Sequence, residues 1–136
     1  MPDRREELRA RLTEAQIALA RRAVAAPGWR RLHGMRFVRP DGGLPLRMVA
    51  EYCYAHEGET GHKIQAASGL RFDDLPDLSD PLTALGLLAL VRERWGTTAH
   101  CLQAVDCCWY VWVEFRLVAG ANTETEALIA ALEVAP

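Results

Sequence analysis

The fold of this chain is decided by a stretch near its middle, DPLTALGLLALVRERWG at residues 80–96. Asp80 is a typical N-cap residue, and Pro81 suits the first helical position, where its missing N–H costs nothing. Apolar residues then follow nearly all round the helix, which is the pattern of a helix buried by neighbours on more than one side. Gly96 is typical of the end of a helix. The sequence therefore predicts a central, core-forming helix over residues 81–95.

The clearest β pattern follows directly, and it predicts a strand pair over residues 99–119. The first strand covers residues 100–105, the chain turns near Asp106, and one long strand then runs to residue 118. Alternation divides this long strand into two faces. The face predicted to meet the core holds Trp109, Val111, Val113, Phe115 and Leu117. The opposite face holds Tyr110, Trp112, Glu114 and Arg116. If helices cover both faces of the sheet, Trp112 is buried there; if they do not, Tyr110 and Trp112 form an aromatic patch flanked by charge. After a turn at 120–122, the capping-box residues Thr123 and Glu126 predict a terminal helix over 123–134.

Upstream, the sequence predicts an N-terminal helix over residues 3–26 and a strand meander over residues 35–67. Thr13 and Gln16 form a second capping-box pair, so the first segment is either one helix or a helix with a break at residue 12 or 13. In the meander, polar turns separate three strands, which we expect at residues 35–39, 46–55 and 62–67. Residues 68–80 are predicted to be a loop.

This order of elements predicts an α+β fold in a single domain that spans residues 1–136. Its order is α-β-β-β-α-β-β-α, and its strands are expected to form one mostly antiparallel sheet of about five strands. Helices packed on that sheet would give a layered α/β/α sandwich. A chain of 136 residues is long enough to bury such a core without disulfides or metal.

Composition and charge exclude several classes of protein. The chain has 16 Lys and Arg, 18 Asp and Glu, and a net charge of −2, so it has no bulk attraction to nucleic acid or to an anionic membrane. No apolar run is long enough to span a membrane, and no secretory signal is visible. Four cysteines, Cys53, Cys101, Cys107 and Cys108, are interpreted as reduced thiols. We therefore expect a cytoplasmic protein without a cofactor.

Two parts of the chain resemble small phage and prophage proteins of the "phage ABA sandwich" type. The first part runs from DLPDLSDP at residues 74–81 through LLALVRE at 87–93 to Trp95 and Gly96. The second is NTETEALIAALE at residues 122–133. The resemblance implies a phage or mobile-element origin and a location in the cytoplasm of a bacterial host cell. It implies no common activity and no catalytic residues, because its motifs are mostly caps and core positions.

No residue pattern predicts catalysis. The two serines are outside any nucleophile-elbow motif, and no phosphate-binding glycine loop is present. Cys101, Cys107 and Cys108 with His100 lack the paired spacing of a zinc site, so we interpret the cysteines as small buried hydrophobic residues. The turn from His56 to His62 holds two imidazoles and two carboxylates, and a metal-dependent enzyme at this turn remains one alternative.

The leading hypothesis is a non-enzymatic phage accessory protein that binds another protein of the host or phage. Inhibition of a host defence complex, as anti-CRISPR proteins achieve, is one form of it. The residues predicted to meet the partner are acidic or aromatic, with one arginine: Glu57, Glu59, Asp73, Asp74, Asp77, Tyr110, Trp112 and Arg116. The oligomeric state stays open, a homodimer included.

A second alternative is a nucleic-acid-binding regulator. Residues 1–31 carry eight arginines against four acidic residues, so this part of the chain is locally basic. The arginines that would contact phosphates are Arg4, Arg5, Arg9, Arg11, Arg21, Arg22, Arg30 and Arg31.

Overall fold

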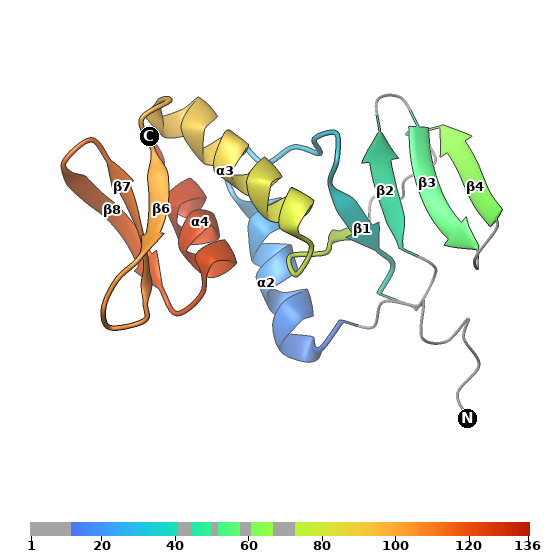
Figure 1. The fold of residues 1–136 in the computed structure, drawn as a ribbon, viewed down its shortest axis with the longest axis horizontal. Coiled ribbons are helices and arrows are strands. Elements are labelled where there is room, and N and C mark those ends of the chain that lie inside the picture. Colours follow the sequence, from blue (N-terminus) through green and yellow to red (C-terminus); the bar gives the residue numbers. More distant parts are fainter. Residues whose placement is uncertain (1–11, 41–44, 50–51, 58–60, 67–72) are drawn as a thin grey trace. The chain divides into compact units, whose positions relative to one another are not determined.

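A computed structural model describes residues 12–40, 45–49, 52–57, 61–66 and 73–136, with side chains described outside residues 49–66. In these residues the chain has an α+β fold with three helices and eight strands, as Figure 1 shows. The elements in chain order are α2 (Glu14–Ala25), β1 (Arg36–Val38), β2 (Leu46–Val49), β3 (Tyr52–Glu57), β4 (Gly61–Ala66), β5 (Leu75–Pro76), α3 (Pro81–Trp95), β6 (His100–Gln103), β7 (Trp109–Val113), β8 (Arg116–Ala121) and α4 (Glu124–Glu133).

The helices begin where their capping residues predict. α3 covers residues 81–95 as expected, and the Thr83 N–H donates to Asp80 Oδ2 at 3.0 Å. At the start of α2, the Thr13 N–H donates to Gln16 Oε1 at 2.8 Å and the Gln16 N–H donates to Thr13 Oγ1 at 3.1 Å. This reciprocal pair begins a helix at residue 14, so of the two alternatives for residues 3–26 the break is the correct one. The predicted helical residues 3–11 lie outside the described part of the chain.

Residue contacts divide the chain, which the sequence predicts to be one domain, into two compact units. Unit 1 comprises Met1–Ala20 and Arg31–Thr83, and unit 2 comprises Arg21–Arg30 and Ala84–Pro136. Both α2 and α3 contribute residues to each unit.

Unit 1 contains an antiparallel five-stranded sheet in the order β4-β3-β2-β1-β5. The predicted meander is present, but the single strand expected over residues 46–55 is instead two strands, β2 and β3, which pair with each other. Strand β5 was expected to be loop. Its two residues pair with β1, where Phe37 lies opposite Pro76 and Val38 opposite Leu75. A strand this short leaves no alternation in the sequence, so only its pairing identifies it.

Unit 2 contains an antiparallel three-stranded sheet in the order β6-β7-β8. The long strand predicted up to residue 118 is a hairpin, because the chain reverses at Glu114 and Phe115 and Arg116 lies opposite Val113. Glu114 adopts a φ of +57° in this turn. The prediction that Phe115 and Leu117 face the core is therefore wrong: Phe115 is fully exposed and Leu117 is 49 % exposed.

The predicted sheet is also wrong. The described strands form two separate antiparallel sheets and not one sheet of about five strands, so the fold is not an α/β/α sandwich around a single sheet. The predicted sequence of helical and strand regions along the chain is retained.

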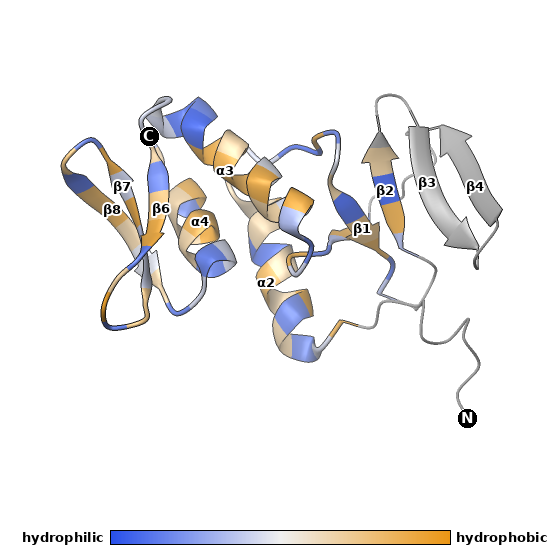
Figure 2. Ribbon diagram, viewed as in Figure 1, coloured by the Kyte–Doolittle hydropathy of each residue, from blue (hydrophilic) through white to orange (hydrophobic). Residues whose placement is uncertain are grey.

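The core of unit 2 lies between α4 and its sheet. α4 packs on β7 and β8, and Val111 of β7 is completely buried together with Leu128, Ile129 and Leu132 of α4. Figure 2 shows hydrophobic residues along α4 and α3. α3 is not buried on all sides as its composition predicts, because Leu85 is 61 % exposed. No helix in the described residues is long and apolar enough to cross a membrane.

The turn between β6 and β7 contains a strained residue. The Cys107 N–H donates to the Ala104 carbonyl at 3.0 Å and the Ala104 N–H donates to the Cys108 carbonyl at 2.9 Å, which closes a three-residue hairpin loop. Cys107 has a φ of +66° at the position where such loops favour glycine. We expect Cys107→Gly to raise the free energy of unfolding by about 0.5–1 kcal/mol, because it removes the left-handed strain. Chemical denaturation measures this, and an unchanged or lower stability would contradict it.

Candidate protein-binding surface

One face of the β6-β7-β8 sheet carries apolar side chains that no other described element covers. Val111 points toward α4, so its neighbours on β7, Tyr110 and Trp112, point to the opposite face. Leu102 of β6 lies opposite Tyr110, and Leu117 of β8 lies opposite Trp112, so both share this face. We call these four residues the open sheet face.

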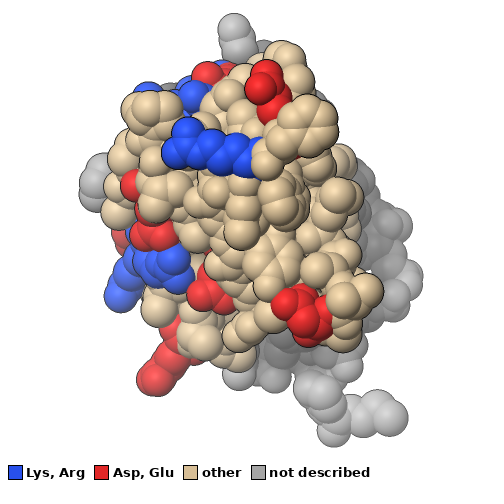
Figure 3. All heavy atoms as spheres, turned by 90° about the vertical axis from the view of Figure 1, so that its left-hand side faces the viewer, with Lys and Arg blue, Asp and Glu red and all other residues tan. Residues whose placement is uncertain are grey.

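The open sheet face is hollowed into a shallow groove. The groove has a volume of about 460 Å³ and crosses all three strands, and its lining consists of Leu102, Gln103, Ala104, Tyr110, Trp112 and Leu117. The sheet faces the viewer in Figure 3, where uncharged side chains make up most of the middle of the surface.

Large apolar side chains extend this surface to both ends of the sheet. Leu102 is 56 % exposed, and the two hairpin tips present Val105 and Phe115 with their side chains fully in solvent. Monomeric proteins seldom expose contiguous apolar patches above a few hundred Å², and larger patches mark interaction sites. The solvent-facing side of an antiparallel sheet is ordinarily polar, so this composition needs an explanation other than folding.

Tyr110 is held rigidly in this surface. Its hydroxyl donates to Asp106 Oδ2 at 2.6 Å, and Asp106 Oδ1 accepts the Cys108 N–H at 2.9 Å. The hydrogen bonds from Tyr110 and Cys108 lower the pKa of Asp106, and the bond to Asp106 raises the pKa of Tyr110. The ring lies against Gly120 of β8, where an added Cβ would come within 2.8 Å of it. A preorganised aromatic side chain loses little conformational entropy when a partner binds.

Arg116 lies apart from Tyr110 and Trp112, although alternation along one long strand placed the three together. The reversal at residues 114–115 puts Arg116 opposite Val113. Its guanidinium lies over the Trp95 ring of α3, 5.8 Å from the centroid. Arg116 is therefore not part of the open sheet face.

The acidic residues of the loop before α3 do not form a second docking surface. Asp73 is exposed, but Asp74 and Asp77 are only 2 % and 3 % exposed. Arg39 Nε lies 3.1 Å from Asp74 Oδ1, and Arg36 Nη1 lies 3.7 Å from Asp77 Oδ2. The pairing of β5 with β1, which alternation does not reveal, brings these carboxylates beside Arg36 at the start of β1 and Arg39 directly after its end.

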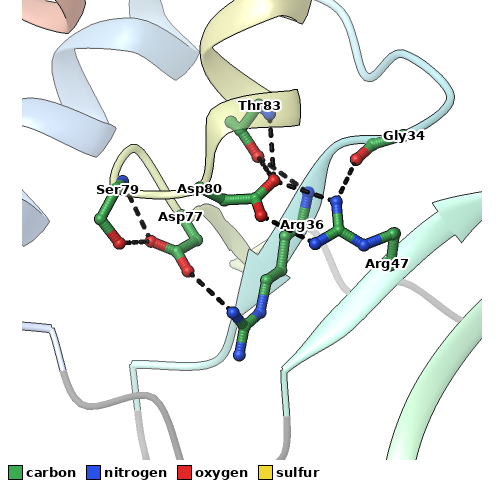
Figure 4. A network of polar contacts seen from close by, with 7 residues as sticks. All are labelled: Gly34, Arg36, Arg47, Asp77, Ser79, Asp80 and Thr83. Atoms are coloured by element: carbon green, nitrogen blue, oxygen red, sulfur yellow. Dashed lines mark hydrogen bonds and ion pairs between the residues drawn. The ribbon is translucent and has the colours of Figure 1, made fainter.

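Asp80 lies within a network of polar contacts in unit 1, as Figure 4 shows. Arg47 donates to both of its carboxylate oxygens, at 2.7 and 3.0 Å, and also to the Gly34 carbonyl at 2.7 Å. The Thr83 hydroxyl donates to Asp80 Oδ2 at 3.0 Å in addition to the N–H that caps α3. Asp80 thus joins β2 to the start of α3, which is a structural role.

This arrangement predicts a loss of stability in acid. Burial raises the pKa of Asp80, but the hydrogen bonds from Arg47 and Thr83 outweigh it and the net pKa is lowered. Stabilisation by Asp80 is therefore complete above the ordinary aspartate pKa of about 3.9 and is lost as the pH falls below it toward the folded-state value. We expect Asp80→Asn to be less stable at neutral pH and to lose less stability between pH 5 and pH 2 (roughly the span over which carboxylates titrate). Thermal melts over this range measure the difference, with the exposed Asp73→Asn as control; a steeper loss in Asp80→Asn would contradict the expectation.

The arginines proposed for nucleic-acid binding are divided among different environments. Arg4, Arg5, Arg9 and Arg11 lie outside the described residues, and Arg21 is exposed on α2. Arg22 pairs with Glu133 at 2.6 Å and with Glu126 at 3.4 Å, and Arg30 pairs with Glu93. Arg31 lies over the Phe37 ring. Carboxylates thus neutralise two of the four described arginines, so these four do not form a continuous basic surface.

The remaining candidates are placed only in part. β3 and β4 form the predicted hairpin with His56 opposite His62, but the side chains of Glu57 and both histidines, and the whole of Glu59, are outside the described atoms. Within the described residues, no group of three His, Cys, Asp or Glu side chains is placed to hold a metal ion.

Burial raises the pKa of the Cys101 thiol to about 11. Cys101, Cys107 and Cys108 are free thiols, and the prediction that they are buried is wrong: Cys107 is exposed in the β6–β7 turn and the other two are half-buried.

The surface therefore contains two residues that the sequence predicted and several that it did not. Alternation placed Tyr110 and Trp112 opposite the core-facing residues, either buried under helices or exposed as a patch, whereas Leu102, Leu117 and Asp106 join them only through strand pairing and the β6–β7 turn. Comparison of the chain with protein-family models, with curated proteins and with solved structures finds no match.

Proposed function

We propose that this protein acts by binding another protein through the open sheet face. The observation that supports this is a groove lined by Tyr110, Trp112, Leu102 and Leu117 on a sheet face that has no cover within the described chain. Aromatic residues surrounded by apolar side chains are the usual centre of protein interfaces. Their exposure adds nothing to the stability of the isolated chain, so binding is the role that accounts for them.

The biological setting that we propose follows from the resemblance to small phage proteins. In that setting, the chain is an accessory protein that occupies a surface of a host or phage protein, and inhibition of a host defence complex by steric occlusion is its concrete form.

A single charged substitution tests the proposed surface. We expect Leu117→Glu to abolish capture of the partner from a bacterial host lysate, because the carboxylate would have to be buried unpaired in the interface. Quantitative affinity purification with mass spectrometry compares the captured proteins. Leu85→Glu is the matched control, since Leu85 is an exposed leucine on α3 outside the open sheet face.

The comparison of the two variants decides the proposal. A protein that wild type and Leu85→Glu retain and Leu117→Glu loses would support it. A partner that both variants retain equally would show that binding uses another surface, and the absence of any stoichiometric partner in a relevant host would oppose protein binding itself.

A further inference from the structure

Two carboxylates lie at the two ends of the open sheet face. Asp106 is in the β6–β7 turn, where its carboxylate accepts a hydrogen bond from the Tyr110 hydroxyl. Glu114 is in the β7–β8 turn. Both side chains are exposed. Two residues of β6, β7, β8 and their turns are basic: His100, which lies opposite Trp112 on the same face of the sheet, and Arg116, whose guanidinium lies over Trp95. A carboxylate thus lies in the turn at each end of β7, and that of Asp106 is bonded to the groove residue Tyr110.

The centre of the groove provides a second feature that favours cations. The rings of Trp112 and Tyr110 line the groove, and the face of an aromatic ring carries partial negative charge that attracts ammonium and guanidinium groups. Asp106 adds a full charge within 2.6 Å of the Tyr110 hydroxyl. Apolar, aromatic and acidic groups therefore occur together on one surface.

We infer that the open sheet face binds a segment of its partner that presents an arginine or lysine between apolar side chains. This inference rests on the proposed function and adds the chemistry of the partner. The apolar side chains of the segment fill the groove beside Leu102 and Leu117. The basic side chain lies over Trp112 or Tyr110 and reaches toward Asp106. A volume of about 460 Å³ has room for a few side chains, which suits a short segment.

Matched short peptides test this inference on the whole protein. The probe is the acetylated and amidated peptide Leu-Arg-Leu-Arg-Leu, and its controls replace both arginines with glutamine or with glutamate. Binding is followed by the NMR signal of the Trp112 indole N–H, which the Trp112→Leu spectrum identifies. We expect the arginine peptide to shift this signal with at least a threefold higher affinity than the glutamine peptide, and the glutamate peptide to bind more weakly still.

Variants of the protein separate charge from shape. We expect Asp106→Asn to lower the affinity for the arginine peptide about threefold more than the affinity for the glutamine peptide, because the amide keeps the acceptor for the Cys108 N–H and removes the charge. Glu114→Gln is expected to act in the same direction. Added salt should weaken binding of the arginine peptide more in wild type than in Asp106→Asn.

The outcomes distinguish this inference from the function on which it rests. Equal affinity for the three peptides, tighter binding of the glutamate peptide, or no shift of the Trp112 signal at millimolar concentrations would each overturn the inference. If the peptides give one of these results but Leu117→Glu still selectively loses a protein captured from the lysate, protein binding through the open sheet face stands and only the inferred basic segment is wrong. If Leu117→Glu loses nothing, both fail.

Discussion

Replacement of Arg47 by alanine is expected to destabilise the protein by about 3 kcal/mol, the low end of the cost of breaking a buried ion pair. Asp80 is 8 % exposed, and without Arg47 its carboxylate would remain buried with only the N–H and hydroxyl of Thr83 as partners. The Gly34 carbonyl would lose its donor as well. We expect a loss at the low end of the range for buried ion pairs because the Arg47 side chain is itself 32 % exposed.

Chemical denaturation of Arg47→Ala measures this loss directly. Arg21→Ala is the control, since Arg21 is an exposed arginine on α2, and it should change the free energy of unfolding by less than about 0.5 kcal/mol. The double variant Arg47→Ala/Asp80→Ala should be less unstable than the sum of the single variants, because removal of both partners leaves no buried charge. A loss below about 1 kcal/mol for Arg47→Ala would show that the pair contributes no more than a surface salt bridge.

Leu128→Ala is expected to lower stability by about 2–5 kcal/mol, whereas Leu117→Ala should lower it by less than about 1 kcal/mol. Leu128 of α4 is completely buried, so its truncation leaves a cavity in the core of unit 2. Leu117 is 49 % exposed on the opposite side of the same sheet, and water already contacts much of its side chain.

The same pair of variants also tests whether the open sheet face belongs to a binding surface or to the folding core. Thermal or chemical unfolding of both variants at one protein concentration gives the comparison. If Leu117→Ala proved as destabilising as Leu128→Ala, Leu117 would be part of a core and the open face would need reinterpretation. Stability that falls on dilution in wild type but not in Leu117→Glu would instead indicate self-association through this face.

Local sequence predicted the helices well, because a helix boundary depends on residues only a few positions apart. Asp80 with Thr83 and Thr13 with Gln16 make their hydrogen bonds within one helical turn, so the residue pattern contains the whole interaction. The start of α4 at Thr123 follows the same rule. The alternating residues 109–113 likewise identify β7, and Val111 is buried on the side that alternation indicated.

Of the residues on the open sheet face, the sequence predicted only Tyr110 and Trp112, because period-two alternation cannot show where a strand reverses. An unbroken pattern across Glu114 and Phe115 places Phe115 in the core, although a positive φ at Glu114 turns the chain and puts Phe115 in solvent. The residue opposite Trp112 is Leu117 only because of that turn and an irregularity in the β7–β8 register.

Local sequence predicted the helical segments and the strand β7, but it left open whether the N-terminal helix is broken and whether Trp112 is buried. Tertiary structure alone decided that the strands form two sheets, that Asp74, Asp77 and Asp80 lie buried against Arg39, Arg36 and Arg47, and that four apolar residues meet on one open face. The physical reason is distance along the chain: capping and alternation act between near neighbours, whereas ion pairs and strand register join residues that only the folded backbone brings together.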